Sequence, residues 1–124
     1  MTAPRDPSGY SRVYKIVDAT QLQALRSSAA WRGAPIDLSD GFVHFSAHDQ
    51  VMGTLRKHFA GRTQLHVLEL SIERIDADRL RWEVSRNGDL FPHLYGPMRS
   101  DMVVEAHAVV ANRDGSFEAL VLQP

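Results

Sequence analysis

The stretch Asp40-Gly-Phe-Val-His-Phe-Ser46 is the one on which the fold prediction depends. Gly41 interrupts the chain, and the β-branched and aromatic residues that follow favour a strand over 42–46. From Ala47 to Ala60 the apolar residues recur at helical spacing, and Gly61 is typical of the end of a helix. Ser46 or Asp49 is predicted to cap this helix. A strand that leads into a helix is therefore predicted at the centre of the chain.

A second strand–helix pair precedes this one. The β-rich run 13–17 is followed by a helical pattern over 18–30, in which Thr20 and Gln23 have capping-box spacing. Beyond the central helix, strands are predicted at 65–72, 80–84, 102–111 and 117–122. We interpret 91–97, which contains two prolines and a glycine, as a rigid loop. Two helices and many late strands indicate an α+β fold, and we expect a mixed, mainly antiparallel sheet with two principal helices.

Composition fits one ordinary domain. The chain has 124 residues, of which 44% are apolar and 23% charged, and we expect a disordered tail over 1–11 followed by a single domain over 12–124. The predicted core is Leu22, Leu25, Val43, Phe45, Leu55, Phe59, Val67 and Leu70. A net charge of −1 and no cysteine indicate no attraction to DNA or membranes and no thiolate chemistry. With no signal-peptide pattern and no long apolar run, we expect a cytoplasmic, bacterial-type protein.

Three places hold the residues that could carry chemistry. His44, on the same strand face as Ser46, could bind a ligand or be a core histidine that donates to a carbonyl. Glu83, on the same strand face as Arg81, could orient a hydroxyl or stabilise positive charge, or form a cross-strand salt bridge on a solvated face. The 91–97 segment could line a site or close one end of the core. No triplet of residues has metal-ligand spacing, so no metal site is expected.

These same blocks resemble a known family. They are Val13-Tyr-Lys-Ile16, Arg32-Gly-Ala-Pro35, Asp40-Gly-Phe-Val-His-Phe-Ser46, Leu80-Arg-Trp-Glu83 and Gly88-Asp-Leu-Phe-Pro-His-Leu-Tyr-Gly96. In this order they resemble the domain-of-unknown-function family 952 (DUF952) from Val13 to about Val104. The resemblance implies an ADP-ribosyltransferase-like fold, a split sheet whose cleft holds a dinucleotide.

A fainter similarity is to RNA 2′-phosphotransferases of that fold. Their His-Val-His-Leu-Ser-like strand, apolar strand and Ser-x-Asn-Gly turn resemble 43–46, 65–70 and 85–88 of this chain. The chain departs from them where they need arginines, because it has Tyr14-Lys15 and Asp40-Gly41 there. The His-Tyr-Glu and Arg-Ser-Glu patterns of ADP-ribosyltransferases are also missing.

The resemblance implies a nucleotide site in a cleft lined by Lys15, His44, Ser46, Glu83, His93 and Tyr95. Lys15, His44, Ser46, His93 and Tyr95 are the candidate ligand-binding residues, and Glu83 and His44 are the candidate catalytic residues. We expect a non-catalytic or weakly catalytic module for NAD or ADP-ribose, with NAD as the candidate cofactor. The alternatives are an enzyme acting at the nicotinamide–ribose bond of NAD and, third, a 2′-phosphotransferase-like enzyme. Neither the oligomeric state nor the ligand follows from the sequence.

Overall fold

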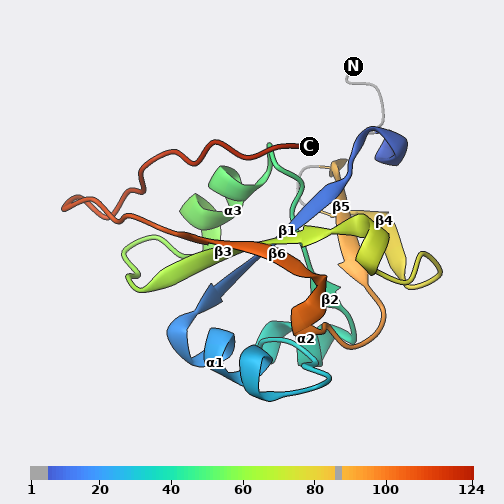
Figure 1. The fold of residues 1–124 in the computed structure, drawn as a ribbon. Coiled ribbons are helices and arrows are strands. Elements are labelled where there is room, and N and C mark those ends of the chain that lie inside the picture. Colours follow the sequence, from blue (N-terminus) through green and yellow to red (C-terminus); the bar gives the residue numbers. More distant parts are fainter. Residues whose placement is uncertain (1–5, 86–87) are drawn as a thin grey trace.

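The computed structural model describes residues 6–85 and 88–124. Its helices and strands, shown in Figure 1, are β1 (Arg12–Asp18), α1 (Ala19–Ser27), α2 (Pro35–Asp40), β2 (Val43–His44), α3 (Val51–His58), β3 (Leu65–Ser71), β4 (Leu80–Val84), β5 (Leu90–Leu94) and β6 (Val103–Ala108). Short 3₁₀ turns are η1 (Pro7–Gly9), η2 (Ile72–Arg74) and η4 (Ser100–Met102). The predicted α+β class is confirmed.

The strands form two sheets of three strands each, with orders β1-β3-β6 and β2-β5-β4. All of the strand pairs described are antiparallel, so the parallel component implied by a mixed sheet does not occur among them. The two sheets meet at one isolated bridge, where Tyr14 and Ser46 exchange backbone hydrogen bonds of 2.8 Å. This bridge brings β1 beside the segment that follows β2, and it therefore brings the candidate residues of the two sheets together.

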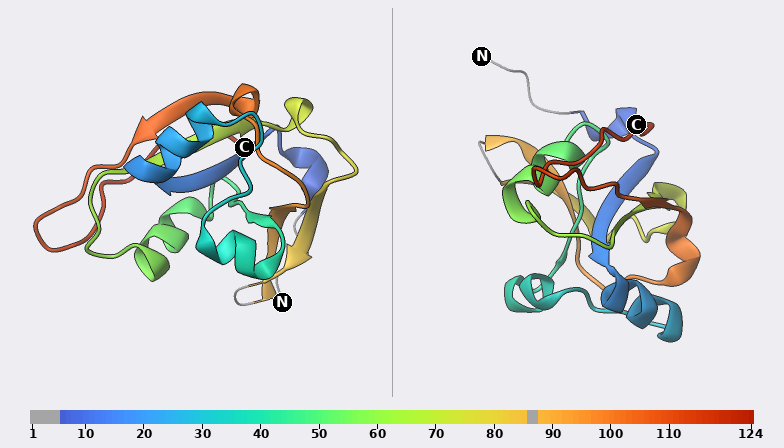
Figure 2. Two further views of the ribbon diagram at one scale, coloured as in Figure 1. Left: turned by 90° about the horizontal axis from the view of Figure 1, so that it is seen from below. Right: turned by 90° about the vertical axis from the view of Figure 1, so that its left-hand side faces the viewer.

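The β1-β3-β6 sheet is apolar on both faces, and a helix covers each. Alternation along β1 sends Val13 and Val17 to one face, where they pack with Leu22 and Leu25 of α1. The neighbouring side chains of β1 and β3 point the other way and pack with Val51 and Leu55 of α3. In the right-hand view of Figure 2, α1 and α3 lie on opposite sides of β1. Of the predicted core residues, all are buried except Phe59, which is half-buried and packs on the α3 side.

The helix boundaries differ from the predictions for local reasons. Asp18 caps α1 by accepting from the backbone of Gln21, whose side chain in turn accepts from the backbone of Asp18. The predicted Thr20–Gln23 capping box is therefore wrong by two residues. The central helix starts at Val51 after a turn and ends at His58, and neither Ser46 nor Asp49 caps it. The short helix α2, which lies between α1 and α3 in the sequence, was not predicted.

Two strand predictions are also corrected. Residues 90–94, most of which we expected in a loop, form the central strand β5 of the second sheet. Pro92 has no N–H to donate to a neighbouring strand, but its carbonyl accepts from the backbone N–H of Phe45, so this residue still takes part in the sheet. Conversely, 117–122 is not a strand. Apart from a bridge between Ala111 and Phe117, it pairs with no described strand, and its side chains Phe117, Leu120 and Leu122 pack on the α3 side of the core.

The ends of the described chain lie together. In Figure 1 the C-terminal segment, coloured red, passes over α3 and returns toward the start of β1. There the backbone N–H of Ser11 donates to the carbonyl of Pro124 at 3.2 Å. The sequence predicted a disordered tail over 1–11, but residues 6–11 contain η1, and Tyr10 packs on Trp82 with ring centroids 5.1 Å apart.

In the described part of the chain, no helix is long and apolar enough to cross a membrane.

Candidate functional site

A cavity of about 480 Å³ opens where the two sheets meet. Its walls come from β1, from the segment 44–46, from β5, from α3 and from the start of α2. The volume lies within the range of about 300–1,000 Å³ that is usual for small-molecule sites. Four predicted site residues line it: Lys15, His44, Ser46 and His93. The structure therefore brings these four residues to one cavity, and whether they bind a ligand stays a prediction.

The other two predicted residues, Glu83 and Tyr95, do not line the cavity, but they support a residue that does. Oε1 of Glu83 lies 2.9 Å from Nδ1 of His93 and accepts from the hydroxyl of Tyr95 at 2.6 Å. Arg81 lies over the ring of Tyr95 at 5.2 Å. The cross-strand side-chain partner of Glu83 is His93 on β5, and their contact is an ion pair only when His93 is protonated.

Asp37 organises the floor of this region, and sequence reasoning missed it. Its carboxylate is 1% exposed and has four contacts: with the ammonium of Lys15 at 2.8 Å, Nδ1 of His44 at 2.6 Å, the backbone N–H of His44 at 2.9 Å and that of Ala34 at 2.7 Å. Burial would raise the pKa of Asp37, but the bonds from His44 and the charge of Lys15 outweigh it and hold this pKa at about 2. Asp37 is therefore ionised, and it binds β1 to β2.

Local sequence explains how Asp37 reaches this position. Pro35 begins α2, where a proline is favoured, and Asp37 is in the first turn, where an acid accepts the free N–H groups. Gly33 has φ +110°, and a Cβ on it would lie 2.4 Å from Cβ of Asp37. A residue larger than glycine would push Asp37 away. Proline followed by an acid two residues later was the signal that could have predicted α2.

His44 has carboxylates at both of its ring nitrogens. Nδ1 is 2.6 Å from Asp37 and Nε2 is 3.0 Å from Asp40, whose side chain is 43% exposed. A carboxylate can only accept, so both contacts are hydrogen bonds only when the ring is an imidazolium. The expectation of a core histidine bonded to a carbonyl is therefore wrong, since the partners of His44 are acids.

An aromatic side chain joins the two histidines. Phe42 stacks on His93 with centroids 4.2 Å apart, and it also contacts His44 at 4.6 Å and Tyr95 at 5.1 Å. Phe42, His44 and Ser46 were predicted to share a strand face, and the ring contact between Phe42 and His44 agrees with that. Phe42 fixes the rings of the candidate site without lining the cavity itself.

Among the residues that the structure describes, the charged groups that line the cavity are basic. They are Lys15 and Arg62, with His44, His58 and His93 as further nitrogen-bearing groups, and no described lining residue has a carboxylate. Lys15 is 5% exposed, and burial lowers its pKa more than the charge of Asp37 raises it. Its ammonium has three N–H donors, and Asp37 is its partner in the described structure.

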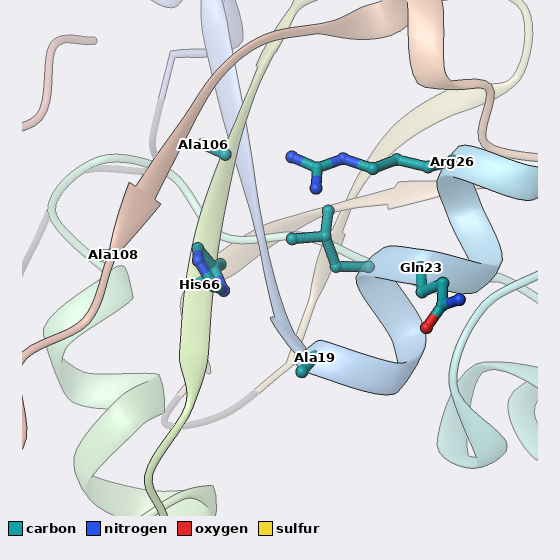
Figure 3. A pocket seen from close by; sticks show the side chains of 7 residues that line it. Ala19, Gln23, Arg26, His66, Ala106 and Ala108 are labelled. Atoms are coloured by element: carbon teal, nitrogen blue, oxygen red, sulfur yellow. The ribbon is translucent and has the colours of Figure 1, made fainter.

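A second hollow lies between α1 and the strands β3 and β6, and Figure 3 shows it. It has a volume of about 530 Å³, and its lining residues are Ala19, Leu22, Gln23, Arg26, His66, Ala106 and Ala108. The side chain of Arg26 reaches across it toward the sheet (Figure 3). None of the predicted site residues is there, and Arg26 is the one fully charged side chain among the described residues that line it. We therefore place the candidate site in the cavity between the sheets.

On the α3 face of the sheet, Glu69, Glu105 and His107 are close enough to share a metal ion. Glu69, however, already accepts from Arg12, His107 and Gln123, each at 2.9 Å. An ion there would have to break the hydrogen bond between Nε2 of His107 and Oε1 of Glu69, while Arg12 and Gln123 hold Oε2. This arrangement is that of a hydrogen-bonded network more than of a metal centre.

Comparison with known proteins identifies the family. The family model described as "Protein of unknown function (DUF952)" matches residues 16–106, so the chain belongs to the DUF952 family. The crystal structure of protein CC0527 from Caulobacter crescentus superposes with a TM-score of 0.81 at 33% identity, over 87% of this chain and 94% of that one. A crystal structure of a double mutant of CC0527 gives the same values. The solution NMR structure of CC0527 superposes with a TM-score of 0.73 at 35% identity, over 84% and 89%. Among curated proteins no match was found.

Proposed function

We propose that this domain binds a nucleotide of the NAD or ADP-ribose type in the cavity between its two sheets. The observation that carries the proposal is Lys15, a buried ammonium that borders the cavity and has Asp37 as its partner. A buried charged donor is stable only when acceptors surround it. Phosphate oxygens would provide those acceptors, and Arg62 at the same cavity would add to their attraction.

The other lining residues fit the rest of such a ligand. Hydroxyls of Ser46 and Thr54, which lie 3.2 Å apart, offer both donors and acceptors. Phe59 and Phe91 give the cavity flat apolar surface against which a base can pack. In this proposal the contact of His44 with the half-exposed Asp40 is the one that a ligand anion would replace. A relation to the ADP-ribosyltransferase fold would agree with the proposal and is part of it.

We favour binding over cleavage of the nicotinamide–ribose bond because Glu83 does not line the cavity. An oxocarbenium-like transition state needs a carboxylate close to it. Oε1 of Glu83 is also already bonded to two donors, Tyr95 and His93. Glu83 therefore acts on a ligand through His93 in this proposal. A cytoplasmic location and NAD as the cofactor stay predictions.

The experiment is ligand-observed NMR with AMP, ADP-ribose and NAD against the purified chain. Binding by wild type should be lost in Lys15→Met and retained in Lys57→Met, since Lys57 is exposed on α3 and outside the cavity. Melting temperatures of both variants establish whether each is folded.

A second pair of variants covers the case in which Lys15→Met does not fold. Arg62→Ala should weaken binding, whereas Arg56→Ala on exposed α3 should not. If the wild-type chain shows no signal with any of the three nucleotides at millimolar concentration, the proposal is wrong.

A further inference from the structure

The hydrogen bonds around His93 determine which of its ring nitrogens carries the proton. Nδ1 lies 2.9 Å from Oε1 of Glu83. The bonds from Tyr95 and His93 lower the pKa of Glu83, so the carboxylate is ionised at neutral pH. An ionised carboxylate only accepts, and Nδ1 must therefore donate. In the neutral ring Nε2 is then left as an acceptor.

His93 is neutral near pH 7 for a physical reason. The side chain is 6% exposed, and burial lowers its pKa from the ordinary value of 6.5, with Glu83 opposing that effect. His44 on β2 also lowers the pKa of His93, and Asp40 on α2 raises it. Arg81 on β4 is directly opposite His93 in the sheet, and its guanidinium lies over the ring of Tyr95. Phe42 stacks on one side of the ring and holds its orientation.

Nε2 of His93 has no hydrogen-bond partner among the residues that the structure describes, and His93 is part of the cavity wall. The two cationic side chains at the cavity, Lys15 and Arg62, can only donate. A ligand with phosphates satisfies those donors, but its hydroxyl protons need an acceptor. Among the lining side chains, His93 is held by Glu83 in the tautomer whose Nε2 is an acceptor.

We propose that His93 is the specificity-determining acceptor of this cavity, and that it takes a hydrogen bond from a ribose hydroxyl of the bound nucleotide. This inference rests on the proposed function and adds to it a choice of ligand: ribonucleotides bind in preference to nucleotides without ribose hydroxyls. Glu83 is the positioning residue, because it fixes the tautomer of His93 without lining the cavity. Tyr95 supports Glu83 in turn.

The test compares AMP with 2′,3′-dideoxy-AMP, which keeps the base and the phosphate and lacks both hydroxyls. Dideoxy-AMP would leave Nε2 of His93 without a donor, so it should bind to wild type about 10- to 100-fold more weakly than AMP. In His93→Phe, which keeps a flat ring against Phe42, the two ligands should bind equally. His48→Phe is the matched control, because His48 packs on Tyr10 outside the cavity, and it should discriminate as wild type does.

Glu83→Gln tests the positioning role on a side chain that is 38% exposed, where loss of the fold is not a concern. It should reduce the discrimination between the two ligands while AMP still binds. The preference of wild type for AMP over dideoxy-AMP should also fall as the pH drops, because a protonated His93 has no nitrogen left to accept a hydrogen bond.

Nitrogen-15 NMR of the imidazole reads the tautomer directly, without any ligand. The spectrum at pH 7.5 should show His93 protonated at Nδ1 alone, and the Nε2-protonated form would overturn the inference. Equal binding of AMP and dideoxy-AMP by wild type would overturn it too, while leaving the proposed nucleotide site intact. Absence of binding by AMP, ADP-ribose and NAD alike would overturn both.

Discussion

Asp37 and Glu69 are two buried carboxylates, 1% and 3% exposed, on opposite faces of the β1-β3-β6 sheet. Each accepts several hydrogen bonds, and each has a pKa below the ordinary value despite burial. Their partners differ. Those of Asp37 include two side chains that line the cavity, Lys15 and His44. Those of Glu69 include Arg12 at the start of β1 and Gln123 near the C-terminal end.

The difference shows that one kind of interaction serves two purposes in this fold. The Asp37 contacts connect α2, β1 and β2, and they set the shape of the candidate site. The Glu69 contacts connect the first strand, β6 and the C-terminal segment, and they hold the chain closed over α3. Removing Asp37 should therefore disturb both the fold and the site, whereas removing Glu69 should disturb the fold alone.

Asp37→Asn should have the largest effect. It leaves the ammonium of Lys15 buried without a counter-charge, and breaking a buried pair in this way costs about 3–5 kcal/mol in the free energy of unfolding. Urea unfolding followed by circular dichroism at pH 7 measures it. Asp40→Asn is the control, since Asp40 is partly exposed, and it should cost less than about 1 kcal/mol. Equal losses in the two variants would contradict the central role of Asp37.

Glu69→Gln should have an intermediate effect. Its partner Arg12 is 25% exposed and can regain water, so the loss is that of charge-assisted hydrogen bonds, about 1.5–3 kcal/mol. Glu105→Gln on the same face is the control, because Glu105 is exposed, and its effect should be near zero. Nucleotide binding, if found, should be unchanged in Glu69→Gln, and its loss there would contradict the separation of the two regions.

The pH dependence of stability should give the smallest effect. The folded pKa of Asp37 is about 2, below the ordinary 3.8, so its charge stabilises the fold above pH 4 and this contribution is lost as the pH falls. Between pH 7 and pH 3 about 1 kcal/mol should disappear. The free energies of unfolding of wild type and Asp37→Asn are compared at pH 7 and pH 3, and the difference between them should be smaller at pH 3. A constant gap would mean that Asp37 does not titrate as the geometry requires.

The same two regions show what the sequence could and could not predict. The strands of the first sheet at 13–17 and 65–72 were predicted from their β-rich and alternating residues, and the structure shows that helices cover both faces of this sheet. The helix α2, and with it Asp37, was missed because the apolar residues of α2 do not form a buried stripe. Ile36 and Leu38 are 60% and 62% exposed. Tertiary contacts, not a periodic stripe, hold this helix in place.

For the site, sequence blocks named four residues that line one cavity but not the contacts between them. Lys15, His44 and His93 lie on three strands and Ser46 follows β2, and only the antiparallel pairings and the Tyr14–Ser46 bridge bring them to one cavity. The partners of His44 and Glu83 depend on where α2 and β5 lie. The expected Ser85–Gly88 turn includes residues 86 and 87, which lie outside the described part of the chain.

The burial of Lys15 also bears on chemical labelling. The chain has two lysines, Lys15 and Lys57; the first is 5% exposed and held by Asp37, while the second is exposed on α3. An amine-directed reagent in native buffer would therefore modify the ε-amine of Lys57 and spare that of Lys15 until the domain unfolds. Because α3 also contributes Thr54 and His58 to the cavity wall, a fluorophore placed on Lys57 would report from the same helix on what enters it.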